Sequence, residues 1–145
     1  MGNFFKKFFS KKKTYYFKVG VRNLLISRNY TRTSKSNHAC LLLDNDIFEY
    51  GVDTDSNGKR KYSRHKNVDK SFKNQFDWDY LDKKGITQMS PDELEKEIIA
   101  NGKWESGHYW LLFHNCHDFV QFCLKKMGCS KDMTKKFFPC YTRKN

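Results

Sequence analysis

The segment LLFHNCHDFVQFCLKKMG (111–128) constrains the fold most, because it sets one cysteine between two histidines at the start of an apolar helix. Asn115 is a good N-cap and Gly128 is a good stop signal, so the pattern predicts a helix that begins at Cys116. Its inner face is expected to comprise residues that recur at helical spacing, namely Phe119, Val120, Cys123, Leu124 and Met127. Cys116 shares this face, so its side chain should point inward at the open end of the helix.

The start of a helix favours a reactive cysteine. Its first turn has unpaired N–H groups and a partial positive charge, which both favour a thiolate over a thiol and can stabilise an oxyanion beside the sulfur. A base is also needed, and His38 is the candidate if its strand packs against the helix. His114 and His117 are nearer in sequence, but we expect neither to reach the sulfur. His114 precedes the cap, and His117 points about 100° away from Cys116.

Spacing alone leaves three roles open for Cys116: nucleophile, buried structural thiol or metal ligand. Free cysteine is often buried as a small apolar residue, so the structural role is a serious alternative. Zinc is less favoured, because no C-x-x-C pair and no neighbouring i, i+4 histidine pair is present. The five cysteines are Cys40, Cys116, Cys123, Cys129 and Cys140.

Other segments predict strands. TYYFKVGVRNLLI (14–26) is rich in aromatic and β-branched residues and predicts an opening strand. HACLLLDNDIFEYG (38–51) predicts a hairpin that turns at 44–46. HYWLLF (108–113) predicts a short strand or an extended segment. The charged segment 52–84 carries only scattered apolar residues, so we expect a long functional link, a lid or a partly disordered loop.

SPDELEKEIIANG (90–102) predicts a second helix. Ser90 is the N-cap, Pro91 takes the first helical position, Glu93 closes a capping box and Gly102 ends the helix. Its inner stripe is expected to comprise Leu94, Ile98 and Ile99.

Length and cysteine content predict one compact domain in a reducing compartment. The chain has 145 residues, which suits a single domain (14–145) after a basic segment (1–13). No run of about 18 apolar residues exists, and no apolar stretch follows the N-terminal lysines, so we expect neither a membrane span nor a secretory signal. Five irregularly spaced cysteines then suggest free thiols in the cytoplasm.

Two motifs carry a family resemblance. NCHDFVQFCLKKMG resembles the Asn-Cys-x-x-Phe helix of the PPPDE clan, the permuted papain-fold cysteine peptidases that include deSUMOylating isopeptidases. HACLLLDNDIFEYG is similar to their His-bearing strand, and His38 before Cys116 is the permuted order. The resemblance covers roughly residues 14–128. It implies an α+β, permuted papain-like (NlpC-like) fold with a small antiparallel sheet packed against the Cys-bearing helix, Cys116 as nucleophile, His38 as base and Phe119 as a packing residue.

A second branch resembles these motifs as well. The lecithin:retinol acyltransferase family and its phospholipase/acyltransferase relatives have the same order and a similar motif. They often place a second polar ring after the histidine, and the matching position falls near Tyr50. That hydroxyl could orient His38, or Tyr50 could be a core tyrosine with a satisfied hydroxyl. The entry TRTSKSNH (31–38) lacks the glycines of the PPPDE pattern, and 52–84 matches neither branch.

The resemblance implies a cysteine-dependent hydrolase that acts by acyl transfer through a Cys116–His38 dyad, with no metal or organic cofactor. A PPPDE-type (iso)peptidase acting on a ubiquitin-like protein conjugate ranks first. A lecithin:retinol acyltransferase-like enzyme acting on a lipid acyl substrate at a membrane is the alternative. An inactive papain-like scaffold and a basic nucleic-acid-binding module are further alternatives.

The net charge of +12 indicates affinity for anionic partners. The lysines cluster in both tails and the long link instead of marking one helix, so nucleic acid is disfavoured. Segment 1–13 would place its phenylalanines opposite its lysines on a helix, which suits peripheral binding to an anionic membrane; a frayed basic tail is the alternative. Gly2 permits N-myristoylation, although Lys6 replaces the usual Ser or Thr.

Overall fold

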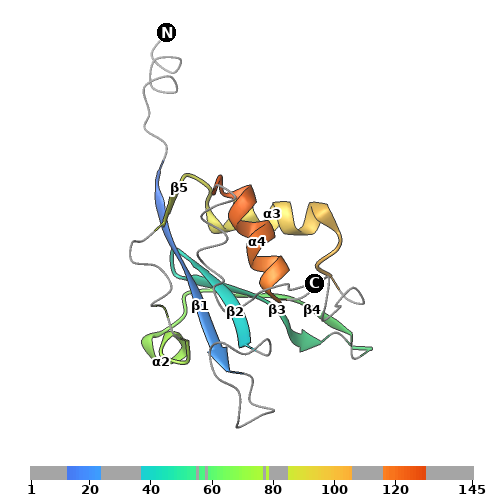
Figure 1. Ribbon diagram of the computed structural model, residues 1–145. Coiled ribbons are helices and arrows are strands. Elements are labelled where there is room, and N and C mark those ends of the chain that lie inside the picture. The colour runs from blue at the N-terminus through green and yellow to red at the C-terminus, as the bar shows by residue number, and fades with distance from the viewer. Residues whose placement is uncertain are drawn as a thin grey trace, which may run out of the picture.

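The computed structural model describes residues 13–23, 37–54, 56–57, 59–76, 78, 85–105 and 116–129. Within them, one antiparallel sheet has the strand order β4-β3-β2-β1-β5 (Figure 1). The strands are β1 (Tyr15–Asn23), β2 (Asn37–Leu43), β3 (Asp46–Thr54), β4 (Arg60–His65) and β5 (Gly85–Thr87). The helices are α2 (Lys70–Lys73), α3 (Pro91–Asn101) and α4 (Cys116–Lys126). The expected α+β class with a small antiparallel sheet is confirmed, whereas the permuted papain-like fold stays a prediction.

The sheet separates two apolar clusters, because side chains alternate between its faces. In Figure 1, α3 and α4 lie on one side of the sheet and α2 lies on the other. The larger cluster joins one face to α3 and α4 and includes Ala39, Leu41, Leu43, Phe48, Tyr50, Leu94, Phe119 and Leu124. The smaller cluster lies on the other face and includes Cys40, Ile47, Phe72 and Phe76. The sheet is therefore buried on both faces at its centre.

The predicted hairpin is confirmed. β2 and β3 pair in antiparallel register, and the chain turns at Asp44 and Asn45. Asp44 adopts a φ of 57°, and its N–H donates to the Tyr16 carbonyl at 2.8 Å, so the turn is also tied to β1. Further along β3, the register with β4 shifts between Tyr50 and Asp53, where Gly51 has a φ of 94°. This bulge leaves the pairing of 47–50 with 62–65 regular.

The segment 52–84 differs from the expected long link, since it contains the edge strand β4 and the short helix α2. β4 adds to β3, and α2 begins at the N-cap Asp69, whose carboxylate accepts from the Phe72 N–H at 2.8 Å. The strand was missed because its sequence RKYSRH carries only one apolar residue and remains half-buried. Its residues are mostly polar, so an alternation of apolar side chains does not reveal it.

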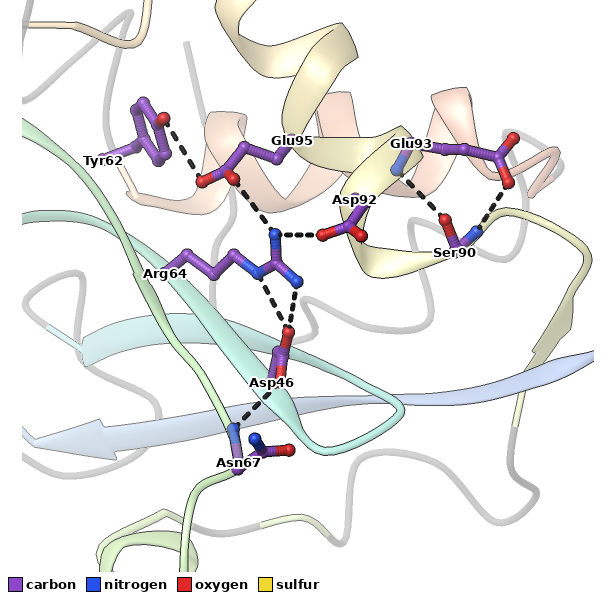
Figure 2. Close-up of polar contacts among 8 residues, drawn as sticks. All are labelled: Asp46, Tyr62, Arg64, Asn67, Ser90, Asp92, Glu93 and Glu95. Atoms are coloured by element: carbon purple, nitrogen blue, oxygen red, sulfur yellow. Dashed lines mark hydrogen bonds and ion pairs between the residues drawn. The ribbon is translucent and has the colours of Figure 1, made fainter.

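The helix predicted for 90–102 is α3, and its capping box of Ser90 and Glu93 is present (Figure 2). Gly102 ends the helix with a left-handed φ of 75°. The predicted inner stripe is correct for Leu94 and Ile98, which are fully buried. It is wrong for Ile99, which is 49% exposed because it lies at the edge of the buried helix face.

Arg64 ties α3 to the sheet (Figure 2). Its guanidinium donates to Asp46 at 2.7 and 2.9 Å, and to Asp92 and Glu95 of α3 at 2.8 and 3.0 Å. The Arg64 side chain is only 8% exposed and covers the ring of Phe48 at 5.6 Å. A nearly buried cation thus bridges β3, β4 and α3.

The predicted inner face of α4 is confirmed, since all five of its residues are buried. The helix packs on β2 and β3, and Gly128 follows it with a φ of 89°. The predictions for 1–12, 24–26, 108–113, His114 and Asn115 concern residues outside the described ranges. Within the described part of the chain, no helix is long and apolar enough to cross a membrane.

Candidate active site

His38 lies near the start of β2 and is 2% exposed. Its Nε2 atom is 2.8 Å from Oε1 of Glu49, which β3 supplies. The hairpin register explains this contact. Glu49 is the register partner of Cys40, so their side chains lie on the same face of the sheet, and alternation along β2 sets His38 on that face too. The Phe76 ring, 6.4 Å away between centroids, lies beside the imidazole.

Cys116 makes the second contact of His38. The Cys116 side chain hydrogen bonds with the imidazole, although the two residues come from α4 and β2. Because Nε2 faces Glu49, Nδ1 is the ring nitrogen that remains for the sulfur. The cysteine is 6% exposed and is the first residue of α4. The structure thus brings together the two residues for which the sequence predicts chemistry.

The surroundings of His38 favour the imidazolium. Burial lowers the pKa of His38, but hydrogen bonds and charge attraction from Cys116 and Glu49 outweigh it and raise the pKa to about 9. The raised pKa favours the charged ring at neutral pH, and a charged ring is protonated on both nitrogens. A thiolate at Cys116 would then face a cation, which is the arrangement of an activated cysteine.

Glu49 is the site residue that the sequence analysis missed. It is 2% exposed, and its second oxygen, Oε2, is 2.9 Å from Nε2 of His65 on β4. The sequence does contain one indication: Glu49 stands between Phe48 and Tyr50 in a strand, so alternation sets its side chain on the face opposite these two rings. Only the register of β2, β3 and β4 shows that this face also carries two histidines.

Tyr50, named above as a residue that could orient His38, lies in the larger cluster. Its ring packs against Trp104 and Phe119 at centroid distances of 5.1 and 5.7 Å, on the face of β3 opposite Glu49. The structure puts Glu49, not Tyr50, at Nε2 of His38. Phe119 is fully buried, as expected of a packing residue.

The other described thiols have different surroundings. Burial raises the pKa of Cys123 well above its ordinary value and that of Cys129 to about 11. His117 is buried at 2% exposure in the first turn of α4. In the described ranges, no group of three or more His, Cys, Asp or Glu side chains is placed to hold a metal ion.

Comparisons with protein-family models, curated proteins and solved structures found no match to this chain. The fold and site define its class in chemical terms: an α+β protein with a buried cysteine, histidine and glutamate in one hydrogen-bonded group.

Proposed function

We propose that this protein is a cysteine-dependent hydrolase that acts by acyl transfer, with Cys116 as nucleophile and His38 as its acid–base partner. The observation that carries the proposal is the buried His38 ring, hydrogen-bonded by Cys116 on one side and by Glu49 on the other. A structural cysteine in an apolar core does not require a charged imidazole or a carboxylate behind it.

The proposed reaction uses these three side chains, the backbone N–H groups at the start of α4 and water. The Cys116 thiolate attacks a carbonyl carbon, and N–H groups in the first turn of α4 stabilise the oxyanion. The imidazolium of His38 gives its proton to the leaving amine or alcohol, which leaves a thioester on the sulfur. Neutral His38 then takes a proton from water as the water attacks the thioester, and the acid product leaves. Glu49 holds the ring in place and stabilises its positive charge.

The proposed substrate class is a protein amide or isopeptide, as in the PPPDE peptidases. The two motifs described above and the order of His38 before Cys116 support this choice. A permuted papain-like fold is part of the same proposal. The alternative is a lipid ester, as in the lecithin:retinol acyltransferase family; the aromatic and basic segment 1–13 favours it.

Alkylation kinetics test the chemistry without a known substrate. Full-length protein is treated with iodoacetamide between pH 5 and 9, and the labelling of each cysteine peptide is measured by mass spectrometry. We expect Cys116 to react at least about tenfold faster than Cys129 near pH 7, because burial raises the pKa of Cys129 to about 11. His38→Ala should slow Cys116 and leave Cys129 unchanged. Equal rates for the two thiols, or no effect of His38→Ala, would contradict the proposal.

Substrate panels distinguish the two branches. Isopeptide-linked ubiquitin-like conjugates and lipid esters are each incubated with the protein and with Cys116→Ser. We expect amine release from the conjugates by the unsubstituted chain only, with a thioester on Cys116 that hydroxylamine removes. Acyl release from lipid esters, without amine release from the conjugates, would contradict the peptidase proposal and favour a lipid ester as the substrate.

A further inference from the structure

We propose that His65 is a positioning residue of this site: it holds one oxygen of Glu49 so that the other stays on His38. The inference rests on the function proposed above for its catalytic meaning, but the geometry stands independently of it. His65 does not touch the reacting atoms, so its effect on Cys116 would pass through Glu49 and His38.

The carboxylate of Glu49 is divided between two imidazoles. Oε1 lies 2.8 Å from Nε2 of His38, and Oε2 lies 2.9 Å from Nε2 of His65. With 2% exposure, Glu49 has almost no access to bulk water. A buried carboxylate is costly unless its oxygens are hydrogen-bonded, so each histidine supports the other's contact.

His65 has neighbours from its own strand and from α2. Its register partner on β3 is Ile47, which directs the ring to the same face as Glu49. Ser63 Oγ lies 3.3 Å from Nε2, and the Phe72 ring of α2 packs at a centroid distance of 4.9 Å. The ring therefore has little freedom to leave Glu49.

The outer side of His65 faces solvent. Its side chain is 30% exposed and borders a hollow of about 530 Å³, which is also lined by Lys66, Asp69, Phe72 and Gln75. The charged groups around the ring in the described chain are Glu49 from β3 and the Lys66 and Asp69 side chains that precede α2. His65 thus separates the buried Glu49 from water while supplying the N–H donor that water would otherwise provide.

Without His65, the carboxylate would lose its fixed orientation. The terminal torsion of a glutamate is broad and roughly two-fold, so loss of the hydrogen bond at Oε2 removes a contact that helps to fix the plane of the two oxygens. Oε1 would then spend less time on His38, and the ring would be held less firmly against Cys116. The acid–base behaviour of His38 therefore reports on His65.

The test compares His65→Gln, whose amide N–H can donate to Glu49, with His65→Met, which fills similar space without a donor. Full-length protein with labelled histidines is titrated by NMR, and the His38 resonances are assigned from the His38→Ala variant. We expect His65→Met to lower the His38 midpoint by about one pH unit, a tenfold change in proton affinity, and His65→Gln to retain most of it. In Glu49→Gln protein, His65→Met should cause no further shift.

Phe72→Ala is the matched control, because it removes the packing on His65 but neither hydrogen bond of Glu49. It should lower the unfolding midpoint in urea and, because both hydrogen bonds of Glu49 can still form, shift the His38 midpoint far less than His65→Met does. An unchanged His38 midpoint in folded His65→Met, or equal shifts in the Met and Gln variants, would overturn the proposal. The titration requires no turnover, so its result is independent of the alkylation result. Slow alkylation of Cys116, together with the expected shift of the His38 midpoint in His65→Met, would contradict the proposed hydrolase function but not the role of His65.

Discussion

His38 gains two polar partners when the chain folds, and this links stability to pH. Its pKa rises from an ordinary 6.5 to about 9 in the folded state, so the folded chain binds this proton more tightly than the unfolded chain. The stabilisation is fully present below about pH 6.5 and is lost as the pH rises through about 9. Folding therefore protects a charge that solvent would not maintain at neutral pH.

We predict that the free energy of unfolding falls by about 1–3 kcal/mol between pH 6 and 9 because of this group. The measurement is urea unfolding at several pH values. Glu49→Gln should flatten the dependence, because it removes one of the two interactions that raise the His38 pKa. A dependence equally steep in Glu49→Gln would show that the protonation of His38 is not its source.

Cys116 and His38 were predictable because each has a local signal: the helix start for the cysteine, and an apolar strand for the histidine. The roles of Glu49 and His65 were not predictable. Alternation indicates that Glu49 lies opposite Phe48 and Tyr50, but only strand register shows that it meets a half-exposed histidine there. Their role depends on pairing across three strands, and a single sequence specifies such register only weakly.

Among the elements, α3 and α4 were predicted well, since caps and helical spacing are local. β4 and α2 were not, because polar residues dominate both and their apolar contacts come from distant strands. Arg64 on β4 shows how such a strand is held. It bonds to Asp46 of β3 and to two carboxylates of α3, and so replaces apolar burial with a shared ion pair.

Arg64→Leu is predicted to destabilise the protein by about 3 kcal/mol, because Asp46, with a side chain only 9% exposed, would lose its cation. Urea unfolding measures the effect. Asp46→Asn combined with Arg64→Leu should recover part of the loss, since the nearly buried carboxylate of Asp46 is then no longer charged. Asp92→Asn is the control: its side chain is 79% exposed, so stability should hardly change. A similar loss in both single variants would contradict the argument.

For the whole molecule, charge is the dominant property outside the site. A chain with a net charge of +12 should associate with anionic bilayers in a salt-dependent way. Segment 1–13 adds the aromatic residues that would make such binding more than electrostatic.

We predict that the full chain floats with vesicles containing phosphatidylserine at low salt, and that removal of 1–13 reduces the bound fraction at least about threefold. Neutral phosphatidylcholine vesicles are the control and should retain little protein. Replacement of the four phenylalanines of 1–13 by serine separates the apolar contribution to membrane binding from the electrostatic one, because the charge is then unchanged. Unaltered flotation of the truncated chain would exclude 1–13 as the membrane-binding segment.

The bulge between Tyr50 and Asp53 has a consequence for how related chains can vary. The bulge lies between the β3–β4 turn and the regular pairing of residues 47–50 with 62–65, which includes Glu49 and His65. Insertions or deletions in the β3–β4 turn can therefore be absorbed at the irregular step, while a one-residue slip before it would turn Glu49 toward the opposite face. Variants of this sequence should therefore tolerate insertions or deletions after Gly51, whereas an insertion or deletion between Ile47 and Tyr50 should abolish function.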